Sequence, residues 1–473
     1  MYKAYITTIK NIRNHPNADR LNIGECFGNF VIIDKSYQEN TPYIYFPVDG
    51  QLSIEYAEYN NLVRKKDDAG NNIGGYLDPA KRNICAIKLR GEKSDGLVMP
   101  LESLAWAGDI STLKVGDAID IWNGKEICKK YIPNRKPRGP AGEAGSKAKR
   151  KAKHTIAPTF FEHVDTEQLA YNLSAFKPGD EIEITLKMHG TSQRTGYHKT
   201  YQGQKRTIWD KIFKREGQAI YDWGGVSGTR RVVLESYDGG FYGDNHFREQ
   251  HSKFFEGKLW KGETVYYEVV GFTDTGAPIM ASCENSKVKD KEFTKQYGKT
   301  TTFSYGCRPG QLNGMIKDKE IVDNVAIVYP VSDIYVYRMT MTNEDGNVVE
   351  YTPDFMRYRC EQMGAKTVPV LWRGVIPEYE PVFFNNAEEA NGLAPNYTIP
   401  INAGEYVKKV AEMFYDGPDP IGKTHVREGV VVRIVNRPTF RAYKCKNWFF
   451  KCLEGIIKDT ADVPDLEEAQ EVE

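Results

Sequence analysis

The sequence lacks several features that would point to a membrane, a secretory route or a metal-rich fold. No apolar run reaches the ~18 residues that a membrane-spanning helix requires, and the first residues lack the apolar block of a signal peptide. The eight cysteines are scattered without a Cys-x-x-Cys pair, so they provide no template for a zinc site or a redox dithiol. We therefore expect a cytoplasmic protein in a reducing compartment, without a membrane partner.

The chain also has a formal net charge of zero, because 64 Lys and Arg residues balance 64 Asp and Glu residues. Any affinity for a polyanion must then come from charge that is segregated along the chain. Such a segment occurs at residues 129–153, which hold ten basic residues against Glu143 alone, spaced by Gly, Pro and Ala. This composition is typical of a flexible linker, either a plain tether or a basic arm that lies along phosphates. Residues 459–473 carry seven acids and no base, which predicts a disordered acidic tail.

The rest of the chain contains enough apolar surface to fold. Its 473 residues are 40% hydrophobic and 12% aromatic, which excludes disorder throughout and allows two to four domains. Before the linker, short β-rich runs separated by turn residues occur at residues 30–34, 43–48, 83–89 and 96–100. This spacing is typical of a small β-barrel. We expect residues 1–128 to form an all-β OB barrel, with an SH3-like barrel as the alternative.

The segment after the linker mixes strand and helix patterns. Strand patterns at residues 181–190, 263–272, 334–341 and 429–435 outnumber helical stretches such as residues 402–415. We therefore expect residues 154–458 to form an α+β domain built on antiparallel sheets.

A first group of reactive residues lies where the strand pattern of residues 181–186 runs into Lys187-Met188-His189-Gly190-Thr191-Ser192. A lysine at the exit of a buried strand is partly desolvated, which favours the neutral, nucleophilic amine. Gly190 permits a tight turn and a close approach to a ligand, and Thr191 offers a hydroxyl to phosphate. Taken alone this is a weak signal, because many surface hairpins contain Lys-x-x-Gly.

Three later segments supply complementary groups. Glu268 lies in mid-strand between apolar neighbours, where a carboxylate requires a partner such as a ribose hydroxyl. Glu428 stands at a strand entrance and suits a metal or its waters. Lys444 and Lys446 are two residues apart, hence on one face of a strand, and both can reach a phosphate. Each residue also has an ordinary structural interpretation, but their combination in this order favours a nucleotide site.

These segments resemble the motifs of the covalent nucleotidyltransferase superfamily, which contains polynucleotide ligases and mRNA capping enzymes. Lys187, His189 and Gly190 resemble motif I, and His at the second position implies the RNA-ligase branch. Glu268, Glu428 and the lysine pair resemble motifs III, IV and V. The resemblance thus implies a nucleotidyltransferase (adenylyltransferase) domain.

Two further segments extend the resemblance. SGTRRV, at residues 227–232, looks like motif Ia, with Arg230 or Arg231 placed to hold a strand or phosphate. TTFSYGC looks like motif IIIa, whose aromatic residue, here Phe303, would stack on adenine. HPNADRLNIGECFGNFVIIDKS, YFPVDGQLS and KLRGEKSDGLVMPL resemble the N-terminal OB module of the OB-first, nick-sealing RNA ligases. HPNADRL also resembles tRNA-binding OB modules, so a nucleic-acid-binding barrel is expected in either case.

The resemblance implies an ATP-dependent RNA ligase that uses ATP and Mg²⁺ (or Mn²⁺). Lys187 would form the lysyl-AMP intermediate, Glu428 would lie at the metal, and Lys444 and Lys446 would neutralise phosphate. We expect a monomer whose partner is a nicked duplex with an RNA 3′-hydroxyl strand, either RNA or an RNA/DNA duplex. The alternatives are a GTP-dependent mRNA capping guanylyltransferase, in which the barrel would follow the transferase domain, and a non-catalytic OB-fold RNA-binding protein.

Overall fold

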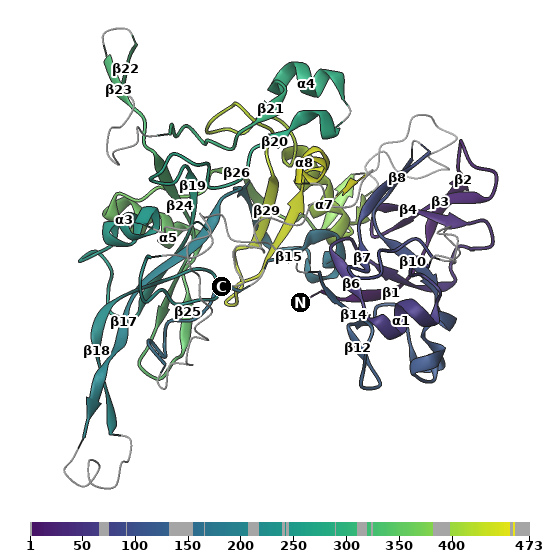
Figure 1. Cartoon of the computed structure of the whole chain (residues 1–473), viewed down its shortest axis with the longest axis horizontal. Coiled ribbons are helices and arrows are strands. Elements are labelled where there is room, and N and C mark those ends of the chain that lie inside the picture. Colours follow the sequence, from purple (N-terminus) through teal and green to yellow (C-terminus); the bar gives the residue numbers. More distant parts are fainter. Residues whose placement is uncertain are drawn as a thin grey trace. The chain divides into compact units, whose positions relative to one another are not determined.

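The computed structural model describes residues 2–65, 75–90, 92–131, 155–164, 166–206, 217–238, 242, 246–288, 290–309, 319–322, 325–381, 398–454 and 457–458 (Figure 1). The chain divides into two compact units. Among the described residues, one unit contains residues 2–131 and 451–458, and the other contains residues 155–450. Within these ranges, no helix has the length and apolar character that crossing a membrane requires.

Short, mostly antiparallel strands build the N-terminal unit. One sheet has the order β10-β5-β1-β11, and three-stranded sheets have the orders β2-β3-β4, β14-β6-β7 and β31-β8-β9. The strands are β1 (Ala4–Thr8), β2 (Lys10–Asn14), β3 (Leu21–Cys26), β4 (Asn29–Asp34), β5 (Pro42–Phe46), β6 (Gly50–Leu52), β7 (Asn83–Ile84), β8 (Ala86–Leu89), β9 (Glu92–Ser94), β10 (Leu97–Pro100), β11 (Ala118–Ile119), β12 (Ile121–Trp122), β13 (Lys125–Glu126), β14 (Cys128–Lys130) and β31 (Ile457–Lys458). Helix α1 (Ile54–Tyr59) and the 3₁₀ helices η1 (Leu101–Ala107) and η2 (Ile110–Thr112) complete the unit. Buried side chains such as Ile6, Ile44, Phe46, Leu52 and Leu104 form its core.

Three of the four predicted N-terminal strands correspond to β4, β5 and β10. The fourth, at residues 83–89, is interrupted at Cys85 into β7 and β8, which belong to different sheets. The unit is therefore β-rich as expected, while the specific OB topology stays a prediction.

The structure differs from the predicted segment boundaries at two places. Lys129 and Lys130, expected to begin the linker, belong to β14 and pair with Gln51 and Gly50 of β6. At the other end, β31 pairs in parallel with β8, so the C-terminal segment joins the N-terminal unit instead of the domain expected to extend to residue 458. This pairing uses the edge of β8 that β9 leaves open, where unpaired backbone groups accept another strand. The linker from residue 132 and the tail at residues 459–473 lie outside the described residues.

The second unit contains two five-stranded sheets. Their orders are β15-β30-β29-β16-β26 and β18-β17-β19-β24-β25, and all pairs except β15 with β30 are antiparallel. The strands are β15 (Glu167–Gln168), β16 (Glu181–Lys187), β17 (Thr191–Lys205), β18 (Gln218–Gly228), β19 (Glu263–Gly271), β24 (Ser332–Thr342), β25 (Val348–Glu350), β26 (Val370–Val375), β29 (Gly429–Ile434) and β30 (Ala442–Lys446). The antiparallel α+β architecture expected after the linker is thus present, and Figure 1 shows β17 and β18 as a long two-stranded ribbon.

Helices and smaller strands complete the second unit. They are α3 (His246–Phe254), α4 (Lys291–Tyr297), α5 (Pro353–Met363), α7 (Ala403–Phe414), η3 (Leu169–Tyr171), η4 (Leu173–Ala175), η5 (Asn285–Val288), β20 (Cys283–Glu284), β21 (Thr300–Thr301), β22 (Lys319–Val322), β23 (Val325–Val328), β27 (Tyr379–Pro381) and β28 (Thr398–Pro400). Helix α8 (Trp448–Glu454) runs across the boundary between the units.

Strand alternation decides which side chains of the first sheet face its core. Ile182, Ile184, Val430 and Val432 pack in one apolar cluster, to which helix α7 contributes Val407. Because successive side chains of a strand point to opposite faces, Lys187 on β16 and Lys446 on β30 belong to the other face. Helix α7 therefore covers one face of this sheet and leaves the charged face for the site described next.

Candidate active site

The centre of the candidate site is a buried carboxylate between two lysines. Lys187 ends β16 opposite Gly429, and Gly429 lies opposite Lys446 on the next strand. Glu428 stands directly before Gly429, and one of its carboxylate oxygens, Oε1, lies 2.6 Å from Lys187 Nζ and 3.3 Å from Lys446 Nζ. The register of three neighbouring strands thus brings together residues from both ends of the second unit.

The charge balance of this group decides the state of Glu428. Burial alone would raise the pKa of the fully buried Glu428 carboxyl, but Lys187, Lys446 and the hydrogen bond with His189 together lower it. Glu428 is therefore ionised at neutral pH, and the two ammonium groups compensate its charge.

Two glycines make this close arrangement possible. A Cβ on Gly190 would lie 2.4 Å from the Val269 carbonyl oxygen and 2.8 Å from Glu268 Cγ, so Gly190 allows the turn after Lys187 to touch β19. Gly429 has φ +149°, and a Cβ there would lie 2.1 Å from the Cys445 carbonyl oxygen. Both positions exclude a side chain because another backbone approaches, whereas the approach of Gly190 to a ligand stays a prediction.

His189 lies in a buried aromatic cluster beside the charged group. Its Nδ1 is 3.5 Å from Glu428 Oε2, and its backbone N–H donates to the Tyr305 hydroxyl at 2.7 Å. Edge-on contacts place the His189 ring 4.6 Å from Phe303 and 4.7 Å from Phe450, measured between centroids. His189 is therefore held in one orientation at the edge of the site.

The second sheet contributes Glu268. This residue is 6% exposed and lies directly between Ser192 of β17 and Tyr335 of β24. The Ser192 hydroxyl contacts the Tyr337 hydroxyl at 2.8 Å, so two tyrosines of β24 line the same region as Glu268. Sequence reasoning missed both tyrosines, although the alternating pattern of residues 334–341 contained them.

Four predicted residues have surroundings that the sequence did not show. The Thr191 hydroxyl accepts from Arg248 at 2.6 Å and is thereby engaged within the protein. Phe303 is 2% exposed within the aromatic cluster, so its ring has a packing role in this conformation.

Arg230 lies beside His163, whose backbone N–H donates to the Arg230 carbonyl, while Arg231, the alternative, is exposed. Lys444 is partly exposed and opposite Val431, whereas Lys446 is the lysine at Glu428.

One buried residue had no recognisable signal in the sequence. His425 is fully buried, with its ring 4.7 Å from that of Tyr305 and 5.3 Å from that of Phe303. Burial lowers its pKa, so the ring is neutral at physiological pH. It extends the wall of the aromatic cluster three residues before Glu428.

The donor set is compatible with a divalent metal only in part. Among the described residues, no group of three or more His, Cys, Asp or Glu side chains could hold a metal ion. Mg²⁺ is commonly bound by one or two carboxylates together with waters and substrate phosphates. Glu428 fits that pattern as a single carboxylate, with the remaining ligands coming from phosphate and water.

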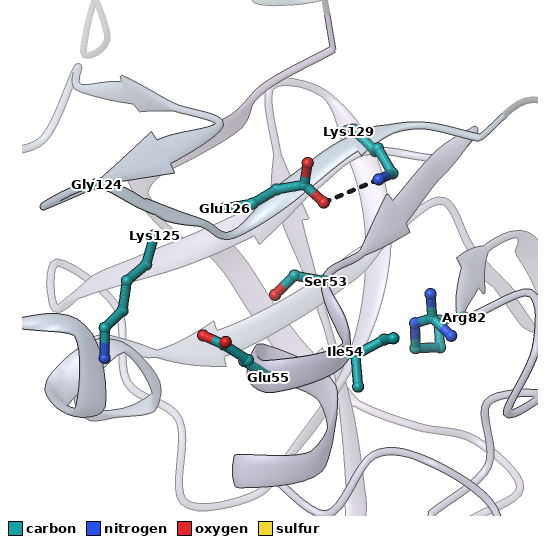
Figure 2. A pocket seen from close by; sticks show the side chains of 8 residues that line it. All are labelled: Ser53, Ile54, Glu55, Arg82, Gly124, Lys125, Glu126 and Lys129. Atoms are coloured by element: carbon teal, nitrogen blue, oxygen red, sulfur yellow. Dashed lines mark ion pairs between the residues drawn. The ribbon is translucent and has the colours of Figure 1, made fainter.

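A separate hollow of about 410 Å³ lies on the N-terminal unit, at the start of α1 (Figure 2). It is lined by Ser53, Ile54, Glu55, Arg82, Gly124, Lys125, Glu126 and Lys129. Its cations already have partners, because Lys129 pairs with Glu126 at 3.0 Å, Lys125 donates to the Trp106 carbonyl, and Arg82 donates to the Pro79 carbonyl. The basic side chains of this hollow are therefore engaged within the protein.

The chain is similar in fold to solved structures of an RNA ligase. A solved structure of an RNA ligase variant from Naegleria gruberi with ATP and Mn has a TM-score of 0.50 and 15% identity, covering 94% of this chain and 97% of that chain. The same ligase with PPi has a TM-score of 0.50 and 14% identity, covering 95% and 97%. No protein-family model matches the sequence, and no curated protein matches it. The likeness is therefore one of fold, and it extends over nearly the whole length of both chains.

Proposed function

We propose that the protein is an ATP-dependent RNA ligase that joins 3′-hydroxyl and 5′-phosphate ends through a lysyl-AMP intermediate. The observation that carries the proposal is the buried Lys187–Glu428–Lys446 group at the exit of a strand. The fold likeness to an RNA ligase solved with ATP and Mn supports it. The proposal also gives each charged residue of the group a task.

Lys187 is the nucleophile of the first step. Its ammonium group loses one proton, and Nζ then forms a bond to the α-phosphorus of ATP and loses a second proton, while the bond from that phosphorus to the bridging oxygen breaks and pyrophosphate leaves. Glu428 is a poor proton acceptor because its pKa is lowered, so both protons pass to water. Lys446 and the nearby Lys444 offset the charge that builds up on the phosphate oxygens.

The later steps return Lys187 to its free form. An oxygen of the 5′-phosphate end attacks the AMP phosphorus, the phosphorus–nitrogen bond breaks, and the amine recovers a proton. The 3′-hydroxyl then loses its proton and attacks the activated 5′-phosphorus, AMP leaves, and a phosphodiester bond is formed. Positioning and charge neutralisation supply most of the catalysis in transfers of this kind.

The remaining residues have positioning tasks in this proposal. Glu268 accepts hydrogen bonds from the ribose hydroxyls, and Tyr335 or Tyr337, which share its sheet region, are better placed than the enclosed Phe303 to contact the base. Glu428 would hold a Mg²⁺ or Mn²⁺ ion together with the substrate phosphates, and such an ion would supply further charge neutralisation. His189 orients Glu428 from the side opposite the lysines.

The substrate we propose is a nick in a duplex whose 3′-hydroxyl strand is RNA. The N-terminal unit and residues 129–153 would grip the duplex through its phosphate backbone. This part of the proposal is supported by the sequence resemblance to OB-first ligases and by the ten basic residues of that segment.

Incubation with α-labelled ATP and Mg²⁺ tests the first step. We expect acid-labile label on the denatured wild-type protein and none on Lys187→Ala, because nearby charge cannot replace a nucleophile. Lys199→Ala is the matched control, since Lys199 is a partly exposed lysine of β17 that pairs with Glu344. Label on a folded Lys187→Ala protein, or a preference for GTP, would overturn the assignment. Sealing of nicks with RNA or DNA at the 3′-hydroxyl end then tests the substrate.

A further inference from the structure

One buried arginine of the second unit makes no ion pair with any acid among the described residues. Arg194 of β17 is 1% exposed, and its Nε and Nη1 have no hydrogen-bond acceptor within the described part of the chain. The ring of Phe160 stacks against the guanidinium, 4.5 Å from its central carbon. Burial lowers the pKa of Arg194, which reflects the cost of holding this charge away from water. The N–H donors of a guanidinium lie in its plane, along its edge.

Arg194 lies next to the proposed nucleotide site. It is two residues after Ser192 on β17, so both side chains point to the same face of the sheet, about 7 Å apart along the strand. Ser192 lies opposite Glu268, and Arg194 lies opposite Tyr266. The row of side chains that contains Arg194 therefore adjoins the row that contains Glu268.

Two further arginines and a neutral histidine lie near Arg194, and we call the group Arg194, Arg230, Arg338 and His163 the arginine cluster. Arg338 lies opposite Tyr266 on β24, and its Nη1 is 3.3 Å from His163 Nδ1. Burial first, and then Arg230, Arg338 and Arg194, hold the pKa of His163 well below its usual value. The position of Gly228, where a Cβ would lie 3.1 Å from Arg194 Nε, links Arg194 to the end of β18 that leads to Arg230.

Among the described residues, the nearest acids form no ion pair with Arg194. Glu350 pairs with Arg338 at 2.9 Å and also with Arg433 at 3.4 Å, so one carboxylate serves two guanidinium groups. Glu162 is exposed and is not within ion-pair distance of Arg194. Arg230, a member of the cluster, and Tyr337, whose ring lies 5.1 Å from that of His163, are both partly exposed, so the cluster extends to the protein surface.

We propose that Arg194 is the centre of a phosphate subsite, where it binds a phosphate group of a substrate of the proposed ligase. Guanidinium groups recognise phosphate through paired N–H donors, and Arg194 has such donors unused. The phosphate has two sources, the triphosphate tail of ATP or the 5′-phosphate end of the nucleic acid. The inference depends on the proposed function for the identity of the substrate, but not for the presence of an anion site.

Thermal unfolding of the full chain tests the anion site without any turnover. In buffer free of phosphate, we expect Arg194→Met to unfold at the wild-type temperature or above it, because the variant buries no uncompensated charge. Inorganic phosphate or pyrophosphate should raise the midpoint of the wild type and not that of the variant. The matched control is Arg437→Met, which removes an arginine paired with Asp180 and should keep the anion response.

Arg194→Lys keeps the charge but loses the fork of donors, and it serves where the Met variant does not fold. We expect it to keep a reduced response to pyrophosphate. A full wild-type response in either Arg194 variant would overturn the phosphate subsite. Because this readout requires no catalysis, it remains valid even if wild-type protein fails to take label from ATP, which would overturn the ligase proposal alone.

The reaction steps separate the two sources of phosphate. If the triphosphate tail binds at Arg194, Arg194→Met should slow self-adenylation by about ten- to a hundredfold, with a raised KM for ATP. If the 5′-phosphate end binds there, self-adenylation should be retained, and sealing by the pre-adenylated variant should fall by a similar factor. Wild-type rates in both steps would show that Arg194 does not contact substrate phosphate.

Discussion

Replacing Lys187 by Met tests the buried Lys187–Glu428–Lys446 group, because this change removes one of the two ammonium groups that face the Glu428 carboxylate. The Lys187 and Glu428 side chains are 9% and 0% exposed, so water cannot take over the lost interaction. Breaking a buried ion pair by removal of one partner typically costs about 3–5 kcal/mol. Lys446 Nζ remains 3.3 Å from the same oxygen, so we expect the lower end, about 3 kcal/mol of unfolding free energy at pH 7.

The pH dependence of this loss has a defined sign. The pKa of Glu428 lies below its ordinary value of 4.5 in the folded protein, because the two lysines outweigh the effect of burial. A carboxyl with a lowered folded pKa stabilises the fold above its unfolded pKa and loses this contribution as the pH falls through the folded pKa. In Lys187→Met the pKa of Glu428 is raised, so this contribution is smaller. The difference between wild type and variant should therefore be complete near pH 7, shrink from about pH 5 downward as Glu428 of the variant takes up a proton, and be clearly smaller at pH 4.

Urea unfolding of the full chain, followed by tryptophan fluorescence at pH 7 and pH 4, measures this difference. The wild type should first be treated with pyrophosphate, since AMP on Lys187 would remove the charge under test. Lys199→Met is the control, because its pair with Glu344 joins side chains that are 39% and 61% exposed and should be worth less than about 1 kcal/mol. Equal losses in the two variants at pH 7, or a loss in Lys187→Met that is unchanged at pH 4, would refute the reasoning.

Two further predictions compare paired positions. Gly190→Ala places a Cβ 2.4 Å from a backbone oxygen, so it should lower the unfolding free energy by about 2 kcal/mol in urea and abolish most of the AMP labelling. Gly225→Ala, whose Cβ has nothing within 4 Å, should lower the unfolding free energy by less than about 0.5 kcal/mol and keep the labelling. Lys446→Ala removes a buried partner of Glu428 and should cost about 3 kcal/mol, while Lys444→Ala, at a partly exposed position, should cost less than about 1 kcal/mol by urea unfolding. Comparable costs in either pair would contradict the packing described for the site.

Local sequence patterns predicted those elements whose side chains alternate between core and surface. The expected helix at residues 402–415 is α7 (Ala403–Phe414), which begins after Asn402, whose side chain accepts a hydrogen bond from the Glu405 backbone N–H. The strand before Lys187 ends at that residue. Both predictions succeeded because the signal, a periodic apolar face with a capping or turn residue, lies within the element itself.

Pairings between distant segments were not predictable in this way. The sequence of β8 does not show that β31, more than 360 residues later in the chain, occupies its open edge. The run at residues 83–89 has one continuous strand pattern, yet it divides at Cys85 because β7 and β8 join different sheets. Register is fixed by tertiary packing, and local propensity does not determine it.

The same limit explains which parts of the candidate site the sequence could and could not reveal. The sequence pattern places Lys444 and Lys446 on one strand face. The residue on the neighbouring strand then determines which lysine contacts the carboxylate, because only Lys446 lies opposite Gly429 and thus beside Glu428. Arg194 offers the converse case. Within TSQRTG it is an ordinary polar strand residue, and only the structure shows that Tyr266, and not an acid, lies opposite it and that Nε and Nη1 have no acceptor among the described residues. The sequence determines the chemical type of each side chain, whereas the availability of that side chain for a substrate depends on which residues the neighbouring strands place against it.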